Sequence, residues 1–128
     1  MICFDTNILI EIILDRQHAA ACGKYIDTSL SDIAVTLLTV DLVMYYAEKN
    51  KLELRQIKTF LKLFVWLPLT ESDADLAFEY FSDDGYEDAL QIAVAIREGC
   101  SAFVTLDKSL AEKYAKVIPI DLLPLALA

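Results

Sequence analysis

Short apolar runs alternate along this chain with longer segments in which apolar residues recur at helical spacing. The short runs predict buried strands at residues 2–4, 33–35, 65–67, 102–105 and 117–120. The periodic segments predict helices at residues 8–14, 19–29, 37–50, 52–64, 87–98 and 108–114, with a further helix that begins at residue 70 or 72. The pattern therefore alternates short strands with helices.

This alternation is typical of an α/β domain with a parallel sheet, helices on both faces and right-handed connections. A chain of 128 residues that is 56 % hydrophobic can bury the core of one domain. Only three Gly and three Pro are present, which argues against long loops or linkers. We therefore expect one domain over residues 1–128.

Charge and cysteine content narrow the class of protein. A formal net charge of −9 argues against a basic nucleic-acid coat protein, but not against an enzyme that reaches nucleic acid through a metal ion. Three well-separated cysteines indicate neither a zinc site nor a disulfide framework and fit a reducing cytoplasm. The acidic N-terminal segment is not a signal peptide, and no apolar run is long enough to span a membrane.

Two acids directly follow predicted strands. Asp5 follows the first strand within Phe4-Asp5-Thr6-Asn7, and Asp107 follows the fourth strand, two residues after Thr105. In open α/β sheets, ligands bind just outside the carboxyl ends of the strands. Each acid is therefore either a helix cap or a ligand of a metal ion.

Two further acids lie in predicted helices. Asp88 is in the first turn of an alanine-rich helix, where it either complements the helix dipole or serves a site. Asp41 lies within an apolar helix, where an unpaired buried carboxylate would be costly. Asp41 must reach water, a cation or a partner, and Glu48 is an alternative to it near the same helix face.

Together these motifs resemble the PIN-domain family of metal-dependent ribonucleases, which includes the VapC-type toxins. The matching segments are Phe4-Asp5-Thr6-Asn7, the Asp41 helix, Asp88-Ala89-Leu90-x-x-Ala93 and Val104-Thr105-x-Asp107. The resemblance implies a parallel sheet in the strand order 3-2-1-4-5. In that order the strands before Asp5 and Asp107 are neighbours, and both acids would enter one crevice.

The resemblance also implies a catalytic site that binds Mg²⁺ or Mn²⁺, for which carboxylates are suitable ligands. Asp5, Asp88 and Asp107 would be the metal ligands, and Asp41 would complete the catalytic set. Thr6, Asn7 and Thr105 would orient carboxylates or water, although Thr6 and Asn7 are equally good capping residues. The chain departs from the family by having Asp41 in place of Glu. Many relatives also carry a further polar or acidic residue two places after the position of Asp107, and this chain has Ser109 there.

A basic stripe is the remaining candidate for RNA contact. Lys51, Arg55, Lys58 and Lys62 recur at the spacing of one helix face. They are either an ordinary solvated surface or a track for RNA phosphates.

These observations lead to the expectation of a cytoplasmic, Mg²⁺- or Mn²⁺-dependent endoribonuclease. By resemblance it would be the toxin of a toxin–antitoxin pair, a homodimer with a separate antitoxin protein as partner. The alternative is a degenerate PIN-like domain that binds RNA or protein without cleavage, which the substitution at Asp41 favours. A phosphorylatable receiver domain is a weaker alternative, because Leu67-Pro68-Leu69 offers no acceptor Asp after the third strand.

Overall fold

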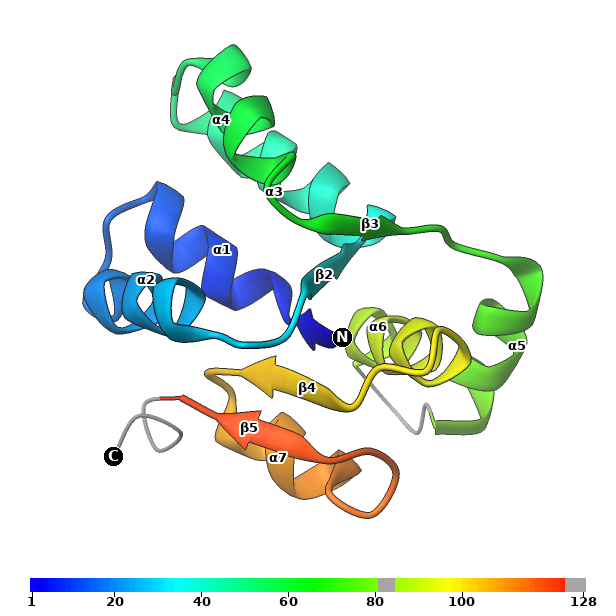
Figure 1. Cartoon of the computed structure of the whole chain (residues 1–128). Helices are drawn as coiled ribbons and strands as arrows, with labels where there is room; N and C mark the ends of the chain where they lie inside the picture. Colours follow the sequence, from blue (N-terminus) through cyan, green and yellow to red (C-terminus); the bar gives the residue numbers. More distant parts are fainter. Residues whose placement is uncertain (81–84, 124–128) are drawn as a thin grey trace.

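The sheet consists of five parallel strands in the order β3-β2-β1-β4-β5, which is the order that the resemblance to the PIN-domain family implied. The computed structural model describes residues 1–80 and 85–123 (Figure 1). The strands are β1 (Ile2–Phe4), β2 (Ile33–Thr36), β3 (Val65–Leu67), β4 (Ala102–Thr105) and β5 (Ile120–Leu122). The helices are α1 (Thr6–Ile13), α2 (Ala19–Thr28), α3 (Leu37–Lys49), α4 (Leu54–Leu61), α5 (Glu71–Tyr80), α6 (Tyr86–Arg97) and α7 (Lys108–Tyr114).

Two elements are shorter than the sequence pattern predicted. Helix α4 begins at Leu54 rather than at residue 52, because Lys51 adopts a φ of 58° and Glu53 caps the helix by accepting a hydrogen bond from the Arg55 amide. Strand β5 begins at Ile120 rather than at residue 117, because the Val117 amide still donates to the Tyr114 carbonyl at the end of α7. Neither change alters the order of the strands.

Successive residues of β1 point to opposite faces of the sheet, and each face carries its own core. Cys3 packs with α5, α6 and α7 through residues such as Ile92 and Tyr114. Phe4 packs on the other face with α1, α2 and α4 through residues such as Leu9 and Leu61. Helices therefore cover both faces, which is the layered arrangement that a parallel sheet requires.

An ion pair joins α5 to α6 at the edge of the first of these cores. The Asp73 carboxylate is 1 % exposed and accepts from Arg97 Nε at 2.7 Å, while Arg97 Nη2 donates to the Pro68 carbonyl. Burial opposes ionisation of Asp73, but the bonds from Arg97 and Thr70 lower its pKa below the ordinary value. This buried acid is thus neutralised within the chain.

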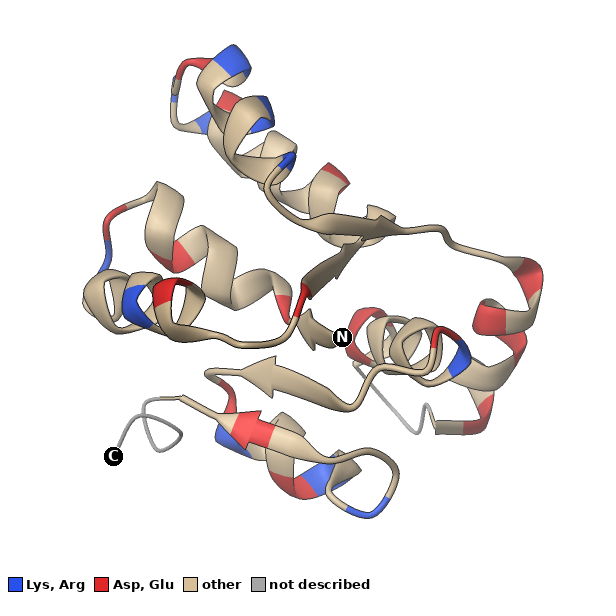
Figure 2. Ribbon diagram, viewed as in Figure 1, with Lys and Arg blue, Asp and Glu red and all other residues tan. Residues whose placement is uncertain are grey.

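Basic residues are concentrated at one end of the molecule, whereas acidic residues are spread over most of it (Figure 2). Lys and Arg gather at the end of the molecule formed by α4 and the end of α3, whereas Asp and Glu are numerous on α5. Among the described residues, no helix is long and apolar enough to cross a membrane.

Candidate active site

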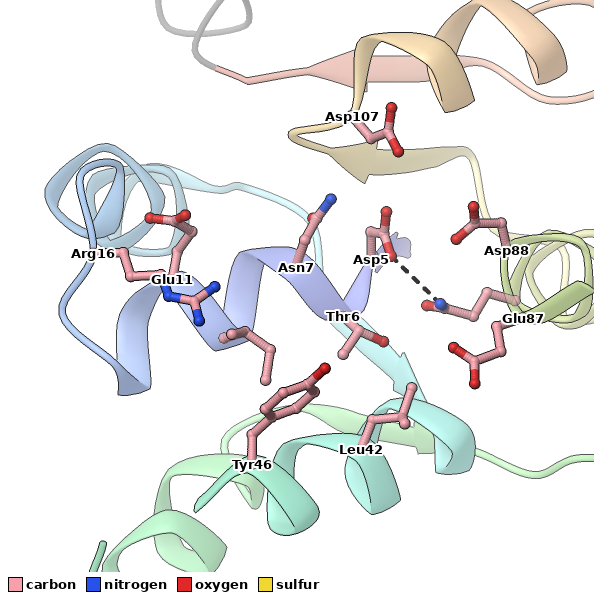
Figure 3. A pocket seen from close by; sticks show the side chains of 12 residues that line it. Asp5, Thr6, Asn7, Glu11, Arg16, Leu42, Tyr46, Glu87, Asp88 and Asp107 are labelled. Atoms are coloured by element: carbon pink, nitrogen blue, oxygen red, sulfur yellow. Dashed lines mark hydrogen bonds between the residues drawn. The ribbon is translucent and has the colours of Figure 1, made fainter. Parts of the chain in front are cut away.

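A cavity of about 310 Å³ opens at the carboxyl ends of β1 and β4 (Figure 3). Its wall consists of residues from α1, α3 and α6 and from the segments that join β1 to α1, α1 to α2 and β4 to α7. These residues are Asp5, Thr6, Asn7, Ile10, Glu11, Arg16, Leu42, Tyr46, Glu87, Asp88, Gln91 and Asp107. The three acids that the resemblance assigned to metal binding therefore line one cavity.

Asp5 is the buried acid of the cavity, with only 4 % of its surface exposed. It connects β1 to α1, and its backbone amide donates to the Val104 carbonyl of β4 at 2.8 Å. One carboxylate oxygen accepts from Thr105 Oγ1 at 2.7 Å, and the other accepts from Gln91 Nε2 at 3.4 Å. Both donors are neutral, so the carboxylate is held in place without being neutralised.

The electrostatic environment of Asp5 opposes its ionisation. Burial raises its pKa to about 6, and the charge of Asp88 adds to the rise, while hydrogen bonds from Thr105, the Thr6 backbone and Gln91 counteract it. Among the described residues, the ion pairs are those of Arg97 with Asp73 and Glu98, and no cation pairs with Asp5. The charge of an ionised Asp5 is therefore not compensated by an ion pair within the described part of the chain.

Asp107 fulfils the structural role that the sequence allowed and also lines the cavity. It is the N-cap of α7, and its Oδ1 accepts from the Leu110 amide at 3.1 Å. Its own amide donates to Thr105 Oγ1 at 3.0 Å, which ties the turn to the bond between Thr105 and Asp5. Capping uses Oδ1, and the exposed carboxylate lies on the cavity wall, so the two roles are compatible.

Asp88 enters the cavity from the first turn of α6 and is half-buried. The turn begins at Gly85, whose φ of 81° is readily adopted only by glycine. Glu87 lines the same cavity and supplies a fourth carboxylate that the sequence pattern did not single out. Asp88 lies in the first turn of α6, where the helix dipole stabilises a negative charge. It also faces Asp5 across the cavity (Figure 3).

Asp41 does not lie with the other acids. The residues of α3 that line the cavity are Leu42 and Tyr46, which are one helical turn apart. Successive residues of a helix are rotated by about 100°, so this phase turns Asp41 away from the cavity, where it is exposed to solvent. Glu48, the alternative to Asp41, is also exposed and is not part of the cavity wall.

Thr6, one of the polar residues expected to orient the acids, begins a chain of hydrogen bonds that leads through Thr39 and Gln91 to Asp5. Thr6 Oγ1 lies 2.7 Å from Thr39 Oγ1, and Thr39 donates to Gln91 Oε1 at 3.0 Å. Because that bond uses the carbonyl end of Gln91, its amide end is directed at Asp5. Gln91 is 2 % exposed, and its position three residues after Asp88 was the sequence signal that could have revealed it.

Asn7 completes the support on the other side of Asp5. Its Nδ2 donates to Thr105 Oγ1 at 3.3 Å, and its Oδ1 accepts from the Leu106 amide at 3.4 Å. The Thr105 hydroxyl thus accepts from Asn7 and Asp107 and donates to Asp5. Both Thr6 and Asn7 lie inside α1, and Asp5 at its N-cap makes no side-chain capping bond.

The opposite end of the cavity carries groups that the sequence pattern did not reveal. Arg16 follows α1, and its guanidinium lies across the cavity from Asp88 (Figure 3). Tyr46 and Glu11 line the same end. No periodic pattern singles out Arg16, since it lies in the turn after Asp15, where φ is 48°.

The basic stripe is exposed but separate from the cavity. Lys51, Arg55, Lys58 and Lys62 are all exposed, and none of them is part of the cavity wall. Lys51 precedes α4, and the Lys62 ammonium lies 3.9 Å from the centre of the Trp66 ring. Any contact of this stripe with RNA would therefore lie outside the acidic cavity.

The donor chemistry of the cavity fits a hard divalent cation. Within residues 1–80 and 85–123, no group of three or more His, Cys, Asp or Glu side chains is close enough to hold a metal without rearrangement. Mg²⁺, however, is usually bound by one or two carboxylates, retained waters and substrate phosphates. Asp5 and Asp88 supply that number of carboxylates, and Asp5 forms no ion pair among the described residues.

Comparison with known proteins agrees with this combination of fold and acidic cavity. The family model for the PIN domain matches residues 2–116, and the chain belongs to this family. No curated protein matches the chain.

Solved structures share the fold at low sequence identity. A toxin–antitoxin complex from Klebsiella pneumoniae is 21 % identical, with a TM-score of 0.76 over 94 % of this chain and 96 % of that chain. The sarcin–ricin-loop-cleaving toxin VapC20 of Mycobacterium tuberculosis is 10 % identical, with a TM-score of 0.74 over 88 % and 94 %. FitAcB from Neisseria gonorrhoeae is 20 % identical, with a TM-score of 0.74 over 94 % and 96 %.

The raised pKa of Asp5 predicts a characteristic pH dependence of stability. The folded chain retains the Asp5 proton up to pH about 6, whereas the ordinary pKa is 3.8. Stability is therefore lost as the pH rises through this window, by roughly 3 kcal/mol at about 1.4 kcal/mol per pKa unit. We expect Asp5→Asn, which cannot ionise, to gain melting temperature over wild type between about pH 4 and about pH 7.

Thermal melts of both proteins in chelator measure this difference. Asp41→Asn, which removes an exposed acid outside the cavity, controls for the change in net charge. A melting-temperature difference between Asp5→Asn and wild type that does not change with pH would show that the environment does not oppose ionisation of Asp5.

Proposed function

We propose that this chain is a Mg²⁺- or Mn²⁺-dependent endoribonuclease that hydrolyses RNA phosphodiester bonds. The main support is the buried Asp5 carboxylate, which lies beside Asp88, accepts from the neutral side chains of Thr105 and Gln91, and has its pKa raised to about 6. A protein that needed Asp5 only for structure would gain stability from a neutral residue there. The arrangement favours a site in which a bound cation balances the negative charge of Asp5.

Three carboxylates would hold this cation, directly or through water: those of Asp5, Asp88 and Asp107. Bound there, a divalent ion supplies stabilisation for the charge that develops on the phosphoryl oxygens. Thr105 and Gln91 restrict the rotation of the Asp5 carboxylate. Asn7 bonds to Thr105 directly, and Thr6 is linked to Gln91 through Thr39. Glu87 lines the cavity and would supply the further acid that was expected from Asp41.

The biological role proposed is that of the toxin in a toxin–antitoxin pair, acting in the cytoplasm. The supporting observations are the PIN-domain match and the fold shared with toxin–antitoxin structures. A separate antitoxin protein would be the partner, and the active chain would form a homodimer.

The alternative function is a degenerate PIN domain that binds RNA or protein without cleavage. Its specific support is that α3 presents Leu42 and Tyr46 to the cavity, so no carboxylate of α3 lies on the cavity wall. Incubation of the purified chain with single-stranded RNA, in Mn²⁺ and in chelator, separates the two functions. Fragments formed only in Mn²⁺ support the nuclease, and intact RNA in both conditions supports the degenerate domain.

The basic stripe gives a prediction about RNA affinity. We expect the combined replacement of Lys51, Arg55, Lys58 and Lys62 by Gln to weaken RNA binding, because each bound phosphate releases counterions. For single strands, the slope of log K against log salt should become shallower by about 0.7 for each phosphate that the variant no longer binds. Fluorescence anisotropy of a labelled RNA at several salt concentrations measures this slope. An unchanged slope would identify the stripe as an ordinary solvated surface.

A further inference from the structure

A second hollow of about 370 Å³ adjoins the acidic cavity on the side of α7. The two share Asp88 and Asp107 as wall residues. Among the described residues, the rest of the second wall is formed by Gly85, Ser109, Leu110, Lys113 and Tyr114. Whatever occupies this hollow therefore lies directly beside the acids.

The tyrosine of this hollow has an unusual environment. Tyr114 is 2 % exposed, and among the described residues its hydroxyl is the one buried side-chain polar atom without a hydrogen-bond partner. Burial raises the pKa of Tyr114, and the charge of Asp88 adds to the rise. A buried hydroxyl that makes no hydrogen bond destabilises the folded chain.

A cation borders the same hollow. The Lys113 ammonium lies 5.4 Å from the centre of the Tyr114 ring. A Cβ added at Gly85 would be 3.7 Å from this ammonium and 3.9 Å from Asp88 Oδ2, so the cation and the acid flank the same backbone position. Ammonium and phenol groups both donate hydrogen bonds, and such a pair suits an anionic oxygen ligand.

We propose that this hollow holds a backbone phosphate of the RNA strand, next to the phosphate that is cleaved at the acids. Lys113 supplies charge and Tyr114 supplies a hydrogen bond. The strand would then cross the acids between two cationic ends, with Arg16 at one end and Lys113 at the other. The inference rests on the proposed function, because it assumes that RNA is the substrate.

Two substitutions test the two contributions separately. Lys113→Gln should make the salt dependence of RNA binding shallower by about 0.7 in log K against log salt, as expected when one phosphate of a single strand is no longer neutralised. Tyr114→Phe should weaken RNA binding by about tenfold without changing the slope. The same Tyr114→Phe protein should melt higher than wild type without RNA, because it no longer buries an unpartnered hydroxyl.

The measurement uses a labelled single-stranded RNA of mixed sequence, with binding followed in Ca²⁺ and cleavage followed in Mn²⁺. Lys116→Gln is the matched control, since Lys116 is exposed close to α7 but is not part of the hollow. We expect Lys113→Gln and Tyr114→Phe to raise KM more than they lower kcat, because the hollow contributes to RNA binding.

The outcomes distinguish this inference from the proposed function. If wild type cleaves the RNA but Lys113→Gln and Tyr114→Phe match it in affinity, or Lys116→Gln loses as much as Lys113→Gln, the phosphate assignment is wrong and the nuclease remains. If Tyr114→Phe melts lower than wild type, its hydroxyl has a structural role and the assignment is also wrong. If wild type neither binds nor cleaves RNA, both proposals fail.

Discussion

Asp5→Asn and Asp88→Asn should each lose Mn²⁺-dependent cleavage of single-stranded RNA by more than about a hundredfold. Changes in residues that only orient a metal ligand already cost about 10–100-fold, and a carboxylate that binds the ion itself should cost more. Asp5 is fixed by Thr105 and Gln91, so an amide at this position keeps the geometry but loses half of its oxygen ligands and its charge. Cleavage of a labelled RNA by purified variants measures the loss.

Asp41→Asn is the matched control for these two variants. It removes one carboxylate from the same domain, but Asp41 is exposed and lies outside the cavity wall. We expect this variant to cleave at the wild-type rate, and circular dichroism should show all three variants folded. Wild-type cleavage by Asp5→Asn or Asp88→Asn would contradict the assignment, whereas loss of cleavage in Asp41→Asn would restore α3 as the source of a catalytic acid.

Asp88→Asn should melt at a higher temperature than wild type in chelator and should gain less from Mn²⁺. The charge of Asp88 contributes to the raised pKa of the buried Asp5, so removing it relieves repulsion in the metal-free protein. In wild type the ion relieves the same repulsion, and at about a hundredfold excess over Kd it stabilises the fold by about 2.7 kcal/mol. For a domain of this size that is a rise of several degrees.

The opposite sign is expected if Asp88 only complements the dipole of α6. In that case Asp88→Asn would melt lower than wild type with or without Mn²⁺, because a favourable charge at the helix start has been lost. Differential scanning calorimetry of both proteins in chelator and in Mn²⁺ decides between the two roles. If Mn²⁺ shifts neither protein, the carboxylates do not form a metal site.

The sheet could be predicted because its strands are short apolar runs between helical segments, and a run as short as residues 102–105 is typical of a buried strand. The placement of Asp5 and Asp107 at the edge of the sheet could be predicted as well, because an acid that comes shortly after a buried strand lies at the carboxyl end of that strand. The strand order, in contrast, came from the resemblance. Alternation alone does not specify which strands are neighbours.

The position of Asp41 relative to the cavity could not be predicted from the sequence pattern. Helix α3 carries large apolar residues all round, from Leu37 through Tyr45, so its periodicity does not indicate which side meets the cavity. The spacing of Gln91 from Asp88 places both residues on one face of α6, but it does not indicate that Gln91 is buried. That burial depends on the contact of Gln91 with Thr39 of α3, and contacts between distant helices are not encoded in local spacing.

Calorimetric titration of metal-free wild type, Asp5→Asn and Asp41→Asn with Mn²⁺ measures whether the carboxylates of the Asp5 cavity bind a divalent cation. We expect saturable binding by wild type and Asp41→Asn, and loss of that binding in Asp5→Asn. Equal binding by Asp5→Asn and wild type, or no saturable binding by wild type, would contradict this expectation.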